Sequence, residues 1–94
     1  MNQVVLYGTR FCPFCVAARR LLRAKGLTFE DVPLDSDPQL RAKVMADCGR
    51  HTVPQIWIGQ RHVGGFTDLQ QLERSGELDE FLSAGVETEK SSAI

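Results

Sequence analysis

Two cysteines in the segment Cys12-Pro13-Phe14-Cys15 lie where the sequence predicts the start of a helix. Pro13 suits the first position of a helix, because the N–H that proline lacks would have no partner there. The free N–H groups and the helix dipole at that end favour negative charge, so they lower the pKa of the Cys12 thiol. Arg10 and an acid-free surrounding segment act in the same direction. Cys12 is therefore predicted to be the more reactive thiol.

Cys15 lies one turn further along the same predicted helix, where we expect it to be more buried and less acidic. A thiolate attacks a disulfide sulfur to form a mixed disulfide, which a second thiol can then resolve. We therefore predict that Cys12 attacks and Cys15 resolves. A strand, a Cys-x-x-Cys pair and a helix in this order are typical of thiol redox sites, and two inert buried thiols are the weaker interpretation.

A zinc site is an alternative for cysteines at this spacing. Cys48 and His51 repeat the two-residue gap, so these two residues could formally complete a set of four ligands with Cys12 and Cys15. However, 32 residues lie between the two pairs, which is more than the usual ligand spacing, and Pro13 stiffens the first pair. We therefore favour redox chemistry and expect no metal.

The elements that must position these thiols follow from the apolar pattern and the turn residues. Residues 4–7 predict a buried strand and residues 27–34 a second one, with the helix that starts at Pro13 and ends near Gly26 between them. Later elements are a helix capped by Ser36 or Asp37, a hairpin of strands 55–58 and 61–64, a helix capped by Thr67 or Asp68, and an apolar helical face at 78–82. The order β-α-β-α-β-β-α-α with a parallel first pair predicts an α/β fold with a four-stranded mixed sheet flanked by helices.

The composition sets limits on the class of protein. At 94 residues, 43% hydrophobic and 24% charged, the chain matches one ordinary globular domain, which we expect to span residues 1–85 with a polar tail at 86–94. Three cysteines are too few, and an odd number, for a secreted disulfide scaffold. We see neither a basic leader followed by an apolar region nor the run of roughly 20 apolar residues that a membrane span needs. A cytoplasmic protein without a membrane partner is expected.

Charge is distributed unevenly along the chain. Residues 1–29 contain no acid and five bases, whereas residues 66–94 contain seven acids and two bases. A basic segment can indicate nucleic-acid binding. A net charge of −1, a pI of about 6.1 and an aromatic content of 7% favour a solvated helix face instead. Nucleic acid is therefore not an expected partner.

Three ordered segments resemble those of the glutaredoxins, in particular the small bacterial-type dithiol class. They are Cys12-Pro13-Phe14-Cys15, Thr52-Val53-Pro54-Gln55 and Gly64-Gly65-Phe66-Thr67-Asp68, and the resemblance spans residues 4–82. It implies a thioredoxin fold and a monomeric enzyme with Cys12 and Cys15 as catalytic residues. The implied reaction is the glutathione-dependent reduction of glutathione mixed disulfides and protein disulfides, so glutathione and proteins carrying such disulfides are the implied partners.

The resemblance also implies a set of glutathione-binding residues. Pro54 is implied to be cis and to set the Val53 backbone beside the thiol, and the segment from Gly65 to Asp68 is implied to hold the γ-glutamyl end. The family often has a base at the position of Thr9 for the glycyl carboxylate, and Arg41 resembles a second position that contacts this group. The implied set is Phe14, Arg41, Thr52, Val53, Pro54, Gly65, Phe66, Thr67 and Asp68.

Two other functions are compatible with this pattern. One is a thioredoxin-like reductase that works without glutathione, against which the segment from Gly64 to Asp68 argues. The other is a dimer that holds a [2Fe–2S] cluster through Cys12 and glutathione thiolates, which Pro13 disfavours in the family. Cys48 has two interpretations, a small core residue or a modifiable accessory thiol.

Overall fold

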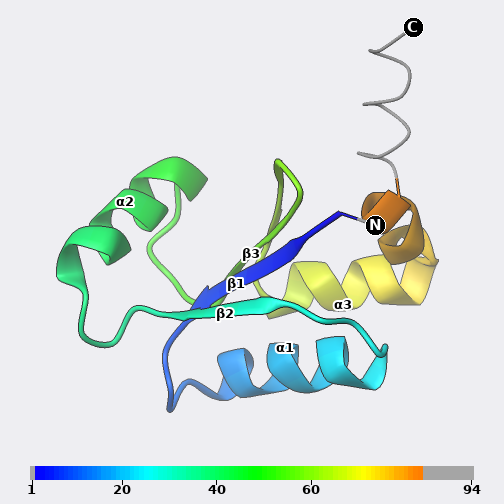
Figure 1. Cartoon of the computed structure of the whole chain (residues 1–94), viewed down its shortest axis with the longest axis horizontal. Coiled ribbons are helices and arrows are strands. Elements are labelled where there is room, and N and C mark those ends of the chain that lie inside the picture. Colours follow the sequence, from blue (N-terminus) through cyan, green and yellow to red (C-terminus); the bar gives the residue numbers. More distant parts are fainter. Residues whose placement is uncertain (1, 84–94) are drawn as a thin grey trace, which may run out of the picture.

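The centre of the molecule is a four-stranded sheet with the strand order β2-β1-β3-β4 (Figure 1). The computed structural model describes residues 2–83, so the predicted tail at 86–94 lies outside the described residues. The elements are β1 (Val4–Gly8), α1 (Pro13–Ala24), β2 (Glu30–Pro33), α2 (Pro38–Cys48), β3 (Gln55–Ile58), β4 (Arg61–Gly64) and α3 (Phe66–Ser75), followed by helical turns at 77–83. The predicted order of elements is confirmed.

The pairing of the strands explains why a helix follows β1. Strands β1 and β2 are parallel, with Leu6 opposite Asp31, and a parallel pair needs a crossover, which α1 supplies. Strand β3 runs antiparallel to β1, with Leu6 opposite Ile56, and β4 forms a hairpin with β3. The predicted mixed sheet is confirmed. Because β1 is central, the loop after it places Cys12 at one end of the sheet, beside the start of β3.

The core lies on one face of the sheet. Figure 1 shows α1 and α3 on that side of the sheet and α2 on the other. The alternation of β1 directs Val4 and Leu6 into this core, where they meet Ile56 and Ile58 of β3. The helices contribute their apolar faces, namely Ala18, Leu22, Leu69, Leu78 and Leu82. Burial of these side chains is the main force that fixes α1, and hence Cys12, against the sheet.

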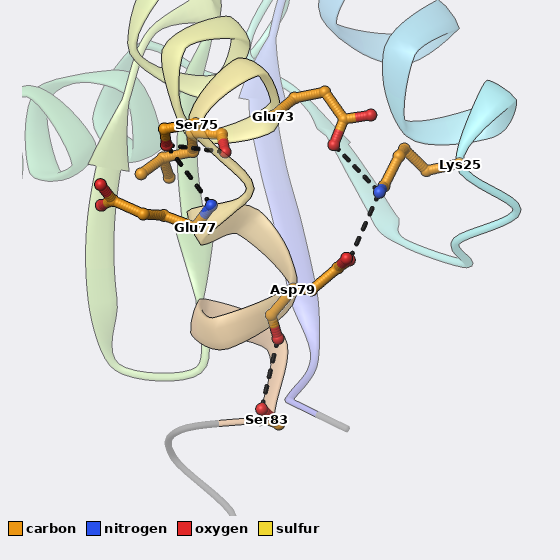
Figure 2. Close-up of polar contacts among 7 residues, drawn as sticks. Lys25, Glu73, Ser75, Glu77, Asp79 and Ser83 are labelled. Carbon is orange, nitrogen blue, oxygen red and sulfur yellow. Dashed lines mark hydrogen bonds and ion pairs between the residues drawn. The ribbon is translucent and has the colours of Figure 1, made fainter.

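An ion-pair cluster joins the last helical turns to the rest of the domain. Lys25 Nζ, just after α1, lies 2.9 Å from Glu73 Oε1 of α3 and 3.3 Å from Asp79 Oδ1 in the turns at 77–83 (Figure 2). Asp79 also accepts a hydrogen bond through its backbone carbonyl from Ser83 Oγ at 3.2 Å. Surface pairs of this kind contribute modestly to stability. Their role here is to hold three helical segments in one arrangement.

Two element boundaries differ from the prediction. Strand β2 covers Glu30–Pro33 rather than residues 27–34, because the Leu27 N–H bonds to the Leu22 carbonyl and so completes the end of α1. Helix α3 begins at Phe66 with Gly65 as its N-cap, so the expected caps Thr67 and Asp68 lie inside the helix. Asp68 still caps, because its Oδ2 accepts a hydrogen bond from the Gly65 N–H.

Within residues 2–83, no helix combines the length and the apolar character that crossing a membrane would require.

Candidate active site

The Cys12 thiol lies at the N-terminus of α1, as predicted. Cys12 is the N-cap residue, with φ −79° and ψ 121°, and Pro13 is the first helical residue. Burial alone would raise the pKa of Cys12, but hydrogen bonds from Cys15 and from the Phe14 N–H, together with the charge of Arg19, outweigh it and lower the pKa. Cys12 is therefore a thiol that forms the thiolate more readily than an ordinary cysteine.

Cys15 has the opposite environment. Its side chain is completely buried, and a Cβ placed on Gly8 would lie only 2.9 Å from its Sγ, so the sulfur packs against the β1 backbone. Burial raises the pKa of Cys15 to about 11, and the nearby Cys12 adds to this increase. The predicted asymmetry between the two thiols therefore holds in both exposure and acidity.

Arg19, rather than Arg10, is the base that acts on the two thiols. Arg19 lies one turn after Cys15, and its guanidinium donates to the Thr9 carbonyl at 3.1 Å and to Asp31 Oδ2 at 2.8 Å. It lowers the pKa of both cysteines. The spacing of four residues from Cys15 was the signal that could have identified it.

The loop before β3 lies beside the Cys12 thiol. The Val53–Pro54 peptide bond is cis, as the resemblance implied. The Val53 carbonyl accepts a hydrogen bond from Cys12 Sγ at 3.6 Å. Pro54 is buried, Val53 is half-buried and Thr52 is exposed. The backbone of Val53 is therefore next to the reactive sulfur and partly accessible to a ligand.

The start of α3 forms the next side of the site. Asp68 Oδ2 accepts hydrogen bonds from the Gly65 N–H and from Arg50 Nη1, both at 2.9 Å. The Arg50 bond is the main reason that the pKa of Asp68 is lowered, although burial opposes it. A Cβ placed on Gly65 would lie 3.5 Å from the Pro54 carbonyl oxygen, so this segment packs against the cis-proline loop. Arg50 was missed in the sequence, although it is the only Lys or Arg between Lys43 and Arg61.

Aromatic side chains join the starts of α1 and α3. The rings of Phe14 and Phe66 have centroids 6.5 Å apart. Phe11 is 88% exposed and Phe14 59% exposed. The thiol is therefore bordered by an apolar surface that the core does not use.

The remaining predicted residues are less closely connected to the site. Thr67 is exposed on the first turn of α3, and Arg41 is half-buried on α2. The Arg41 side chain makes no hydrogen bond or ion pair with any residue from 2 to 83. The structure thus brings together Cys12, Val53, Pro54, Gly65 and Asp68, and leaves Arg41 without a contact to them.

The four residues weighed as zinc ligands do not form a cluster. In the part of the chain that the structure describes, no three His, Cys, Asp or Glu side chains are grouped so that they could hold a metal ion. Cys48 Sγ instead lies 3.6 Å from the Met45 carbonyl oxygen and 3.8 Å from that of Arg50, at the end of α2. Cys48 is only half-buried, so it is not the fully buried core residue that one interpretation expected.

The two thiol environments predict selective alkylation. At pH 7 a thiol with a pKa of about 11 is ionised to only about one part in 10,000, so iodoacetamide should modify Cys12 far faster than Cys15. Because the pKa of Cys12 is lowered, its alkylation rate should rise with pH and level off below the ordinary thiol value of 9.0. Peptide mass spectrometry of the reduced protein would measure both, with Cys48→Ser as the control for the third thiol. Equal labelling of Cys12 and Cys15 would contradict the assignment.

Comparison with known proteins gives the family. The family model described as Glutaredoxin matches residues 4–63. The chain is 51% identical over 84 residues to a glutaredoxin of Pseudomonas aeruginosa, covering 89% of this chain and 100% of that protein. It is 40% identical over 82 residues to glutaredoxin 3 of Escherichia coli, covering 87% of this chain and 99% of that protein.

Solved structures agree with this result. The solution structure of glutaredoxin from Brucella melitensis superimposes with a TM-score of 0.81 at 44% identity, covering 90% of this chain and 92% of that one. A buckwheat glutaredoxin–glutathione complex gives a TM-score of 0.82 at 26% identity, covering 88% and 78%. The thioredoxin fold implied by the sequence is therefore confirmed. The chain belongs to the glutaredoxin family of thiol–disulfide oxidoreductases.

Proposed function

We propose that this protein reduces glutathione mixed disulfides and protein disulfides, with glutathione as the reductant. The observation that carries the proposal is the position of Cys12 Sγ, which lies 3.6 Å from the Val53 carbonyl oxygen, in the loop that packs against Gly65 at the N-terminus of α3. A thiolate, an accessible backbone segment and a free helix N-terminus are what a tripeptide thiol needs in order to bind and react. The buckwheat relative solved with glutathione supports the choice of ligand.

Each end of glutathione has a complementary group in this site. The N-terminus of α3 can receive the γ-glutamyl carboxylate, because the first N–H groups of a helix have no partner within the helix and its dipole favours an anion. The Asp68 carboxylate, whose pKa is lowered, is ionised at neutral pH and can bind the ammonium group. The Val53 backbone pairs with the cysteinyl residue, with Thr52 and Pro54 fixing its position and Phe66 beside it. We place Arg41 near the glycyl carboxylate.

In the first half-reaction, the Cys12 thiolate attacks the glutathione sulfur of a mixed disulfide. The S–S bond between substrate and glutathione breaks, a Cys12–glutathione disulfide forms, and the substrate leaves as a thiolate that takes a proton from water. A second glutathione thiolate then attacks the bound glutathione sulfur, which releases oxidised glutathione and restores the Cys12 thiolate. Cys15 is not needed for this cycle.

Protein disulfides require the second thiol. Cys12 attacks one sulfur, and Cys15 loses its proton as it attacks the Cys12 sulfur, so that the reduced substrate leaves and a Cys12–Cys15 disulfide forms. Two glutathione molecules then reduce this disulfide. The high pKa of Cys15, about 11, keeps it protonated until Cys12 is engaged. The apolar surface at Phe11 and Phe14 gives protein substrates a contact area next to the thiol.

A turnover assay with two alternative reductants tests the proposal. The wild-type protein should reduce a glutathionylated peptide when glutathione, glutathione reductase and NADPH are supplied. It should show little activity when thioredoxin reductase and NADPH are supplied without glutathione and glutathione reductase. Equal or greater activity with thioredoxin reductase would favour the thioredoxin-like reductase.

A second experiment tests the [2Fe–2S] alternative. Visible charge-transfer bands and a dimer in gel filtration, after anaerobic addition of iron and sulfide, would favour it. We propose a monomer of the cytoplasm, where glutathione keeps thiols reduced.

A further inference from the structure

Gln55 is a polar side chain that is buried in the interior of the domain. It is the first residue of β3, directly after Pro54, and it is completely buried. A buried amide is costly unless its donors and acceptor find partners. Both ends of the Gln55 amide do have partners, and these partners lie on opposite sides of it. The residue therefore links two parts of the structure.

The chemistry of the partners fixes the direction of each bond. Gln55 Nε2 lies 2.9 Å from the Thr52 carbonyl oxygen, which can only accept a hydrogen bond. The amide must therefore present its NH₂ to Thr52 and its Oε1 to His62, whose Nε2 lies 2.6 Å away. It follows that His62 Nε2 carries the hydrogen and donates it.

The imidazole of His62 is itself held in place. Trp57 is the partner of His62 across the β3–β4 hairpin, and the two rings pack with centroids 4.6 Å apart. Because Trp57 fixes the imidazole ring, the His62 Nε2–H is held in place as the hydrogen-bond donor to Gln55. The chain of contacts thus runs from His62 of β4 through Gln55 to Thr52 in the loop before β3.

The last link reaches the backbone beside the reactive thiol. The Thr52 carbonyl and the Val53 N–H belong to the same trans peptide unit, so they point in opposite directions. Because Gln55 holds the carbonyl toward the interior, the Val53 N–H is turned away from it. The Val53 N–H has no hydrogen-bond partner among residues 2–83. The Val53 carbonyl accepts a hydrogen bond from the Cys12 thiol.

We propose that His62 is a positioning residue that acts through Gln55, holding the Thr52–Val53 peptide so that the Val53 N–H faces the glutathione moiety bound at Cys12. This role rests on the proposed function, because it requires glutathione to pair with Val53. It predicts that loss of the His62 hydrogen bond weakens recognition of the glutathionyl group and leaves the reactivity of the thiol itself unchanged.

Two substitutions separate the hydrogen bond from ring packing. His62→Phe keeps a ring against Trp57 but removes the donor, whereas His62→Gln removes the ring but keeps an N–H donor near the position of Nε2. Both are made in a Cys15→Ser background, in which the Cys12–glutathione disulfide persists. The rate constant for transfer of glutathione from a glutathionylated peptide to Cys12 is then measured by quenched flow and intact mass. Alkylation of Cys12 by iodoacetamide provides the second readout, because it needs no contact with Val53.

We expect His62→Phe to lower the transfer rate constant about tenfold and His62→Gln to keep it within about threefold of the parent. Alkylation should stay within about twofold in both variants. A Gln55→Met variant should match His62→Phe, and combining the two should add little, because both interrupt the same link.

Four outcomes would overturn the role of His62 or the proposed function on which it rests. A parental rate constant in His62→Phe, or an equal loss in His62→Gln, would mean that packing rather than the hydrogen bond matters. A parallel fall in the alkylation rate would mean that His62 acts on the thiol and not on recognition. A wild-type protein that transfers glutathione no faster than free cysteine would overturn the proposed function itself, and this result is visible before any His62 variant is tested.

Discussion

Replacing Cys12 with serine is expected to abolish turnover of a glutathione mixed disulfide, whereas Cys15→Ser should retain much of the wild-type rate. A hydroxyl is not ionised near neutral pH and is a weak nucleophile, so the Cys12 variant should lose at least about 1,000-fold in kcat/KM. Cys15 is fully buried and has a pKa of about 11, so it takes no part in the attack on a glutathione sulfur. The glutathione-coupled assay on a small glutathionylated peptide measures both.

The substrate decides what Cys15 contributes. With a protein disulfide, Cys15→Ser should trap a mixed disulfide between Cys12 and the substrate, because no second thiol resolves it. Intact mass spectrometry would detect this adduct, and Cys48→Ser serves as the matched control for loss of one thiol outside the site. If the Cys12 and Cys15 variants lost activity equally on the small substrate, the division of roles between the two thiols would be wrong.

Much of the fold could be predicted because local signals and burial agree. The short apolar run at residues 4–7 predicted a buried strand, and Pro13 and Gly26 predicted the limits of the helix after it. Gly26 does adopt a left-handed φ of 73°, directly after the C-cap Lys25. Such signals depend only on neighbouring residues. Strand β2 was predicted to begin too early, because the Leu27 N–H bonds to the Leu22 carbonyl and so completes the end of α1.

The sequence predicted the parts of the site that lie within a short motif. It did not predict the contacts between side chains that are distant in the sequence. The position of Cys12 at a helix start follows from local sequence, and the cis bond before Pro54 came only from the family resemblance. Arg50 and Asp68 are 18 residues apart in the sequence, and nothing local indicates that they pair. The same holds for His62 and Gln55, because register across the hairpin decides their contact. Pairing across the fold is therefore the information that the sequence pattern lacks.

Gly64→Ala is expected to lower both stability and recognition of glutathione, through one added methyl group. Gly64 has a φ of +119°, a conformation that residues with a Cβ rarely adopt. A Cβ at this position would clash with the Asp68 carboxylate and would lie 3.0 Å from Arg50 Nη1. We expect a loss of about 2 kcal/mol in the free energy of unfolding, measured by urea denaturation. The displaced Asp68 should also lower kcat/KM for glutathionylated substrates by about 10- to 100-fold.

A second glycine separates backbone strain from the clash at Asp68. Gly76, after α3, has a φ of +81°, but a Cβ there would meet no atom within 4 Å. Gly76→Ala should therefore cost about 1 kcal/mol from the left-handed backbone alone and leave kcat/KM unchanged. If Gly64→Ala lost no more stability and no more activity than Gly76→Ala, the Asp68 carboxylate would not need its observed position. The expected difference between these two variants arises because β4 ends on a glycine directly under the carboxylate that we assign to the ammonium group of glutathione.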